Sequence, residues 1–120
     1  MLEITEHTAV DDYGRLNQCL SALQEAGVRI AVDDTGAGFA SLRHVLRLAP
    51  DIIKLDITLV REVDQRPRMQ ALIAALLTFA QGTRADLIAE GVENERQLDT
   101  LKALGVPFAQ GFHLGHPQVP

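Results

Sequence analysis

The chain has 120 residues, of which 47% are hydrophobic and 22% are charged, and its formal net charge is -5. This composition is typical of one soluble globular domain, and the negative charge argues against binding of nucleic acid polymers, which requires a basic face. The longest apolar run, residues 71–80, is ten residues long, whereas a membrane-spanning helix needs roughly 20. We therefore expect no membrane insertion by this segment.

Cysteine usage bears on the cellular compartment. Cys19 is the only cysteine, so an internal disulfide is excluded. A chain without disulfides suits a reducing compartment. We therefore expect a cytoplasmic location.

Short β-like segments alternate with helical ones along the chain. The first elements in chain order are a strand at 2–6, a helix at about 12–26, a strand at 29–34 and a helix that follows Ser41. Gly27 is a typical stop for the first of these helices. Ser41 is a typical N-cap for the second, which Pro50 ends.

The same alternation continues to the end of the chain. The remaining elements are a strand at 51–56, a helix at 67–81, a strand at 86–93, a helix from Asn94 to Gly105 and a strand at 107–111. Pro67 suits the first turn of its helix, and Gly82 is expected to follow the last. Asn94 is a good N-cap because Gln97 follows three residues later.

Five strands that alternate with four helices predict an α/β fold with parallel strands and right-handed crossovers. An open doubly wound sheet and part of a (βα)8 barrel both fit this pattern. In residues 53–56, Ile53 and Leu55 oppose Lys54 and Asp56, so one phase is apolar and the other brings polar groups towards the carboxyl end of the strand. This alternation favours a partial (βα)8 TIM-type barrel, whose active site lies at that end.

The length bears on domain organisation. A barrel of this type takes roughly 250 residues, and five strands cannot close a ring of eight. We therefore expect residues 1–120 to be the C-terminal half of a single barrel domain whose N-terminal half is absent.

Polar residues stand near the end of every predicted strand. They are Glu3, then Asp33 and Asp34, then Lys54 and Asp56, then Glu90, and finally Gln110. Carboxylates are ligands that Mg²⁺ and Mn²⁺ prefer, and adjacent aspartates can serve two neighbouring ions. Two glycines, Gly36 and Gly38, allow the loop after the aspartates to approach a ligand closely.

Several of these residues also suit purely structural roles. An Asp-Asp pair before glycine favours a simple turn as well. Lys54 also suits an exposed edge strand or an ion pair with Asp56. Glu90 and Glu93 also favour the start of the following helix through its dipole.

Five motifs together point to a family. LEITE, DDTGAGFASL, IIKLD, AEGVE and QGF occur in this order and cover nearly the whole chain. In this the chain resembles the C-terminal half of an EAL domain, the bacterial phosphodiesterase that hydrolyses cyclic di-GMP. The resemblance implies a TIM-type barrel, hydrolysis of cyclic di-GMP to pGpG, and two bound Mg²⁺ or Mn²⁺ ions.

The resemblance also implies roles for individual residues. Glu3, Asp33 and Asp34 match metal ligands, Glu90 matches a further acidic group at the metal site, and Lys54 matches the lysine that contacts the attacking water. Asp56 and Gln110 match supporting positions, and Glu6 matches the glutamate that steadies the loop containing Gly36 and Gly38.

The Glu-Ala-Leu signature and a metal-binding asparagine of the family belong to earlier strands and do not occur in this sequence. We therefore expect the isolated chain to be inactive and to pair with a second copy or with the missing half. The alternative is an EAL-like module that binds a nucleotide or a protein without catalysis.

Overall fold

The computed structural model describes residues 1–5, 12–35 and 39–109. In these residues five short parallel strands form one sheet, and helices connect them. The elements are β1 (Leu2–Ile4), α1 (Tyr13–Glu25), β2 (Ile30–Thr35), α2 (Phe39–Arg47), β3 (Ile52–Leu55), α3 (Ile57–Arg61), α4 (Pro67–Thr83), β4 (Asp86–Ala89), α5 (Glu95–Leu104) and β5 (Phe108–Ala109).

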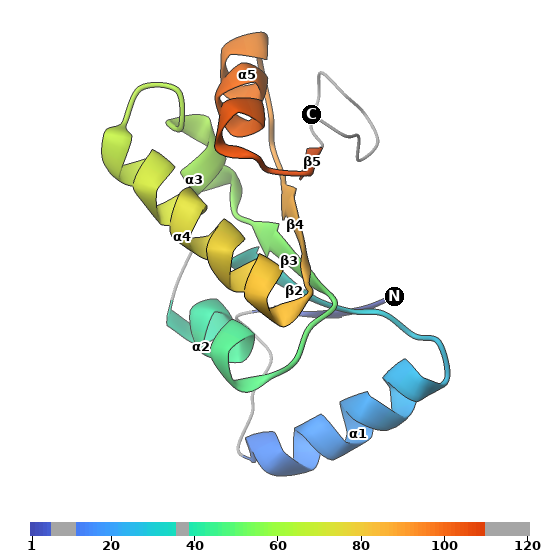
Figure 1. Cartoon of the computed structure of the whole chain (residues 1–120). Coiled ribbons are helices and arrows are strands. Elements are labelled where there is room, and N and C mark those ends of the chain that lie inside the picture. The colour runs from blue at the N-terminus through green and yellow to red at the C-terminus, as the bar shows by residue number, and fades with distance from the viewer. Residues whose placement is uncertain (6–11, 36–38, 110–120) are drawn as a thin grey trace.

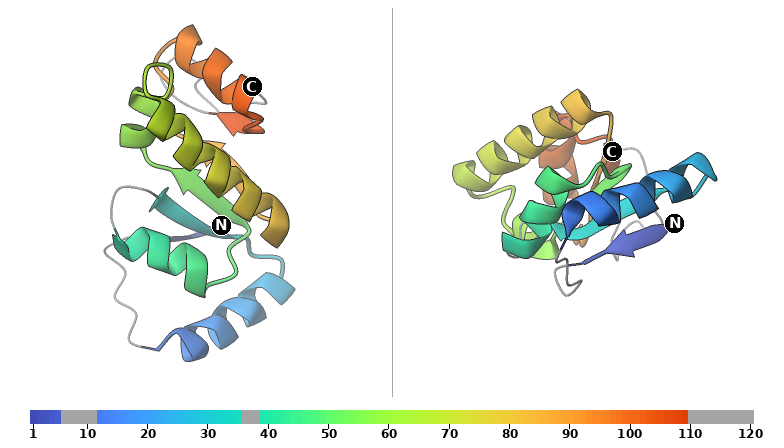
Figure 2. Two further views of the ribbon diagram at one scale, coloured as in Figure 1. Left: turned by 60° about the vertical axis from the view of Figure 1, so that its left-hand side comes forward. Right: turned by 90° about the horizontal axis from the view of Figure 1, so that it is seen from below.

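The strand order distinguishes between the two predicted architectures. The strands lie in the order β1-β2-β3-β4-β5, so every crossover advances by one strand in the same direction. Right-handed crossovers of this kind place their helices on one face, whereas a doubly wound sheet reverses direction at a switch point. The larger helices follow one another in chain order from α1 to α5 (Figure 1), and the succession is the same after a turn of 60° (Figure 2). The arrangement is that of a partial (βα)8 barrel, as predicted.

The two faces of the sheet differ in burial. Ile53 and Leu55 of β3 and Leu87 and Ala89 of β4 are buried and belong to the hydrophobic core between sheet and helices. Lys54 lies between the two buried β3 residues but is only half-buried. The predicted alternation is therefore correct, and the polar phase is the one that faces away from the helices. No helix in the described part of the chain is long and apolar enough to cross a membrane.

The predicted ends of α1 and α5 are confirmed. The Asp12 side chain caps α1 by accepting a hydrogen bond from Arg15 N at 3.1 Å. The Asn94 side chain caps α5 by accepting one from Gln97 N at 2.9 Å. Gly27 and Gly105 follow the two helices with φ values of 92° and 91°, which glycine adopts without steric cost.

Two helix boundaries differ from the prediction. Ser41 lies inside α2 and is not its N-cap, because α2 already begins at Phe39. Gly82 lies inside α4, which continues to Thr83. One glycine costs a helix only about 1 kcal/mol relative to alanine. The end of α4 is set instead by Arg84, which adopts a left-handed conformation with φ 61°.

One helix was not predicted. The segment between β3 and β4 contains α3 as well as α4, so the described chain has five helices and not four. With five residues, α3 is too short to show a hydrophobic period of 3.6,. Its start is fixed by the Asp56 side chain, which accepts a hydrogen bond from Thr58 N at 2.9 Å.

Candidate active site

Lys54 lies at the centre of the polar sheet face. Its ammonium group forms a hydrogen-bonded ion pair with the carboxylate of Glu3, although β2 separates their strands. The side chain of Ala31, which is opposite Glu3 in the sheet register, is only a methyl group. The long Lys54 side chain thus spans β2 to reach β1.

The charges around Lys54 show which residues the fold brings together. Burial by itself lowers the pKa of Lys54, but the hydrogen bond that Lys54 donates to Glu3 and the negative charges of Glu90, Glu3 and Asp33 outweigh it, so the pKa is raised above its ordinary value of 10.5. These carboxylates come from β1, from β2 and from the segment after β4. One lysine therefore faces three acidic groups, and the cluster has an excess of negative charge.

The backbone of β2 explains the adjacent aspartates. Val32 pairs with Ile53 and Thr35 pairs with Leu55, so three steps along β2 match two along β3. This shift in register is the geometry of a β-bulge in the backbone between Val32 and Thr35,. Bulges often stand next to active sites, where they redirect side chains. A bulge, and not a simple turn, is thus the local structure of the Asp-Asp pair.

Glu90 is held next to Lys54 by the path of the chain after β4. Its backbone N–H donates to Leu55 O at 3.4 Å, which extends the pairing of β4 with β3. Gly91 then turns the chain with φ 75°, and a Cβ at this position would lie 2.3 Å from Cγ1 of Ile57. Any other side chain here would force Ile57 to shift, so glycine suits the path that the chain takes directly after Glu90. In the sequence, the signal for this turn is a glycine directly after the predicted site residue Glu90.

Asp56 has a different role from the acidic groups around Lys54. Its carboxylate accepts hydrogen bonds from the backbone N–H and the hydroxyl of Thr58, which fix the start of α3. Asp56 is also buried. It therefore contacts α3 and not Lys54, although it follows the same strand.

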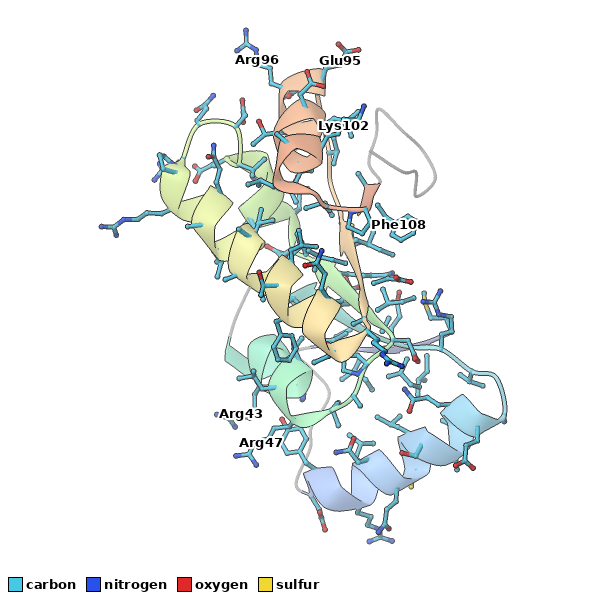
Figure 3. The ribbon with its side chains drawn as sticks, viewed as in Figure 1. Arg43, Arg47, Glu95, Arg96, Lys102 and Phe108 are labelled. Carbon is cyan, nitrogen blue, oxygen red and sulfur yellow. The ribbon has the colours of Figure 1, made fainter. Side chains whose placement is uncertain are left out.

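Phe108 is an aromatic residue on the polar sheet face that is not among the predicted site residues. Phe108 of β5 pairs with Ile88, which pairs with Lys54, so the three residues form one row across the sheet. The half-buried ring of Phe108 points away from α5 (Figure 3). An apolar residue in the polar phase of a strand was the signal for this position.

The remaining predicted site residues cannot be placed in this cluster. Glu6, Gly36, Gly38 and Gln110 lie outside the described residues, as does the side chain of Asp34.

The donor set suits a hard divalent cation. Glu3, Asp33 and Glu90 offer carboxylate oxygens, which Mg²⁺ and Mn²⁺ prefer, and together they have more charge than Lys54 balances,. Within residues 1–5, 12–35 and 39–109 no three such side chains stand close enough to one another to hold an ion. Lys54 is the cation to which Glu3 is bound in this arrangement.

Comparison with known proteins concerns the sequence and the fold of the chain as a whole. The EAL domain family matches residues 1–117. Cyclic di-GMP phosphodiesterase PdeB of Shewanella oneidensis is 33% identical over 116 residues, which are 97% of this chain and 14% of that protein. The EAL domain of Mycobacterium smegmatis DcpA has a TM-score of 0.86 at 36% identity, covering 98% of this chain and 53% of that one. The complex of Klebsiella pneumoniae BlrP1 with manganese and cyclic di-GMP has a TM-score of 0.84 at 33% identity, covering 96% of this chain and 29% of that one.

These matches cover nearly all of this chain but only part of each relative. The chain spans 14 to 19% of the length of the curated relatives that it matches. The likeness to solved EAL domains confirms the predicted partial barrel. From its sequence and its fold, the chain belongs to the EAL domain family.

Proposed function

We propose that this chain is the C-terminal half of a cytoplasmic phosphodiesterase domain that hydrolyses cyclic di-GMP to linear pGpG. The observation that carries the proposal is the convergence of Glu3, Asp33 and Glu90 on Lys54 at the polar face of the sheet. Relatives that are cyclic di-GMP phosphodiesterases by name support the choice of substrate. The single free cysteine supports the reducing compartment,.

The acidic residues would hold the metal ions. We assign Glu3, Asp33, Asp34 and Glu90 as ligands of two Mg²⁺ or Mn²⁺ ions, and the manganese complex of a related EAL protein supports a divalent metal. When bound, such ions lower the pKa of a water molecule and neutralise charge on the phosphate that is attacked.

The chain's own residues orient the reactants. The Lys54 ammonium group can donate hydrogen bonds to the attacking water and to a phosphate oxygen, since its three N–H donors exceed what Glu3 alone accepts,. The Glu90 carboxylate can accept a proton from that water. We give Asp56, Glu6 and Gln110 supporting roles. Asp56 acts through its cap on α3, while Gly36 and Gly38 belong to the loop near the ligand.

The strands of this chain do not complete the site. The five described strands leave β1 and β5 as sheet edges, and such edges favour pairing with further strands. We propose that they pair with the other half of the domain or with a second copy, and that the isolated chain has no turnover.

The test is the substitution Asp33→Asn in the full-length protein. It keeps the size of the side chain but removes a charge from the cluster, and we expect turnover to fall by roughly 10³-fold or more, as the loss of several kcal/mol of transition-state stabilisation implies. Formation of pGpG is followed by chromatography with Mg²⁺ or Mn²⁺. The matched control is Asp86→Asn, which also removes a carboxylate from a strand, but at the amino end of β4. Retained activity in Asp33→Asn contradicts the proposed function.

A further inference from the structure

Gln97 is a buried polar residue that the candidate site does not include. Its side chain is 3% exposed, whereas the two residues before it, Glu95 and Arg96, extend away from the molecule at the start of α5 (Figure 3). Burial of an amide group is favourable only when its hydrogen bonds are satisfied. The partners of Gln97 therefore indicate why it is buried.

The Gln97 amide joins two segments that are distant in sequence. Its Nε2 donates to Arg61 O at 3.0 Å, which is the carbonyl of the last residue of α3. Its Oε1 accepts from Glu93 N at 2.7 Å. A carbonyl that α3 leaves without an internal partner and a loop N–H are thus satisfied by one side chain.

Both of these segments lead back to the site. The segment that ends at Glu93 begins with Glu90, and α3 begins with the cap residue Asp56. The two segments also touch near the site, because Gly91 packs directly on Ile57. At the far end they are joined again by an ion pair between Arg61 Nε and Glu93 Oε1, 3.7 Å apart, but both of its side chains are largely exposed. Since an exposed pair contributes little, Gln97 supplies the directed contacts there.

We propose that Gln97 is a positioning residue, which holds the Glu90–Glu93 segment on α3 and thereby fixes the Glu90 carboxylate relative to Lys54. The contacts to Arg61 and Glu93 stand on the structure alone, while the effect on turnover rests on the proposed function. A loose segment would leave Glu90 free to move away from the cluster. Displacements of about 1 Å in catalytic groups cost on the order of 10²-fold in rate.

Two substitutions of Gln97 in the full-length protein distinguish its hydrogen bond to Arg61 O from its hydrogen bond with Glu93 N. Gln97→Ala removes both side-chain hydrogen bonds. Gln97→Glu keeps an acceptor for Glu93 N but loses the donor to Arg61 O, so it is the variant of choice if Gln97→Ala folds poorly. Asn94→Ala is the matched control, because it removes the α5 cap in the same helical turn and leaves both Gln97 side-chain contacts in place.

Two measurements decide the proposal. The first is hydrogen exchange of the Gly91–Glu93 amides, which we expect to be about tenfold faster in Gln97→Ala and nearly unchanged in Asn94→Ala. The second is steady-state hydrolysis of cyclic di-GMP, in which we expect kcat to fall about 10- to 100-fold in Gln97→Ala while KM changes less than about threefold. For Gln97→Glu we expect an exchange rate and a kcat between those of Gln97→Ala and those of the parent.

The outcomes are distinguishable. Unchanged exchange in Gln97→Ala, or a loss of kcat that Asn94→Ala reproduces, overturns the positioning role. A parent protein that does not hydrolyse cyclic di-GMP contradicts the proposed function alone. In that case the exchange rates still decide whether Gln97 holds the segment.

Discussion

The two ends of the sheet treat charge differently. At the amino end, Arg29 and Asp86 form a one-to-one ion pair of 2.7 Å whose side chains are 55% and 46% exposed. At the carboxyl end, the Lys54 side chain is only 12% exposed and faces Glu3 together with two further carboxylates. A balanced, hydrated pair needs no other partner, whereas an excess of negative charge favours binding of a cation. The charge balance, and not the number of charges, therefore indicates which end of the sheet has the site.

Asp51 extends the contrast at the amino end. Its carboxylate accepts hydrogen bonds from Ile30 N at 2.7 Å and from Gln24 Nε2 at 3.1 Å. A carboxylate that accepts from a backbone N–H and an amide has its hydrogen bonds satisfied within the protein. In a (βα)8 barrel, polar residues at this end serve stability.

The largest expected effect that separates the two ends is on turnover. Lys54→Met in the full-length protein removes the ammonium group but keeps an unbranched side chain, and we expect turnover to fall by about 10²- to 10⁴-fold, the usual contribution of a positioned proton donor. Arg29→Met removes the cation at the amino end and should change turnover less than about twofold. Turnover is measured as pGpG formation. Equal losses in both variants would contradict the assignment of the site to the carboxyl end of the sheet.

The next effect is on stability and compares two glycines with positive φ. Gly91→Ala places a methyl group 2.3 Å from Ile57, while nothing lies within 4 Å of the corresponding position at Gly27. We expect Gly91→Ala to lower the free energy of unfolding by about 2–4 kcal/mol, from strain and overpacking together. For Gly27→Ala the strain alone should cost about 1–2 kcal/mol. Urea unfolding measures both, and a larger loss at Gly27 would contradict the close packing of the segment after Glu90.

The smallest effect is a pH dependence that sharpens the contrast between the two cations. The pKa of Lys54 is raised in the folded state, although burial opposes the shift, because Glu3 and the nearby carboxylates favour the charged form. Its stabilising contribution is therefore fully present below the ordinary pKa of 10.5 and is lost as the pH rises through the folded-state value,. Above this pH we expect the free energy of unfolding of the metal-free parent to fall relative to that of metal-free Lys54→Met.

Arg29→Met is the control for the pH experiment, because arginine keeps its charge throughout the alkaline range. Urea unfolding at several pH values from about 9 to 12 provides the comparison. If the difference in free energy of unfolding between the parent and Lys54→Met does not depend on pH, the raised pKa of Lys54 is contradicted.

The sequence allowed much of this organisation to be predicted, for identifiable reasons. The alternation in residues 53–56 placed Lys54 on the polar face, and the cap Asn94 marked a helix start, because each of these signals is local. The small helix α3 has no such signal beyond Asp56. The β-bulge in β2 arises from the register with β3, which no pattern within β2 can show.

The site was only partly predictable for the same reason. The acidic and basic residues could be named from their places at strand ends, but which of them meet depends on contacts across strands. Lys54 bonds to Glu3 across β2, and Asp56 bonds to Thr58 of α3, although alternation alone gives Lys54 and Asp56 the same phase. Gln97 could be recognised as part of a helix start, but its bond to Arg61 spans 36 residues.

The order of the strands has a consequence for biosynthesis. Each strand after β1 pairs with the strand that immediately precedes it in the chain. A βα unit that leaves the ribosome therefore finds its partner edge already formed, and it need not wait for a distant segment. Short sequence separations between paired strands keep the entropy of loop closure small. The partial barrel can thus grow strand by strand during translation, always at its newest edge.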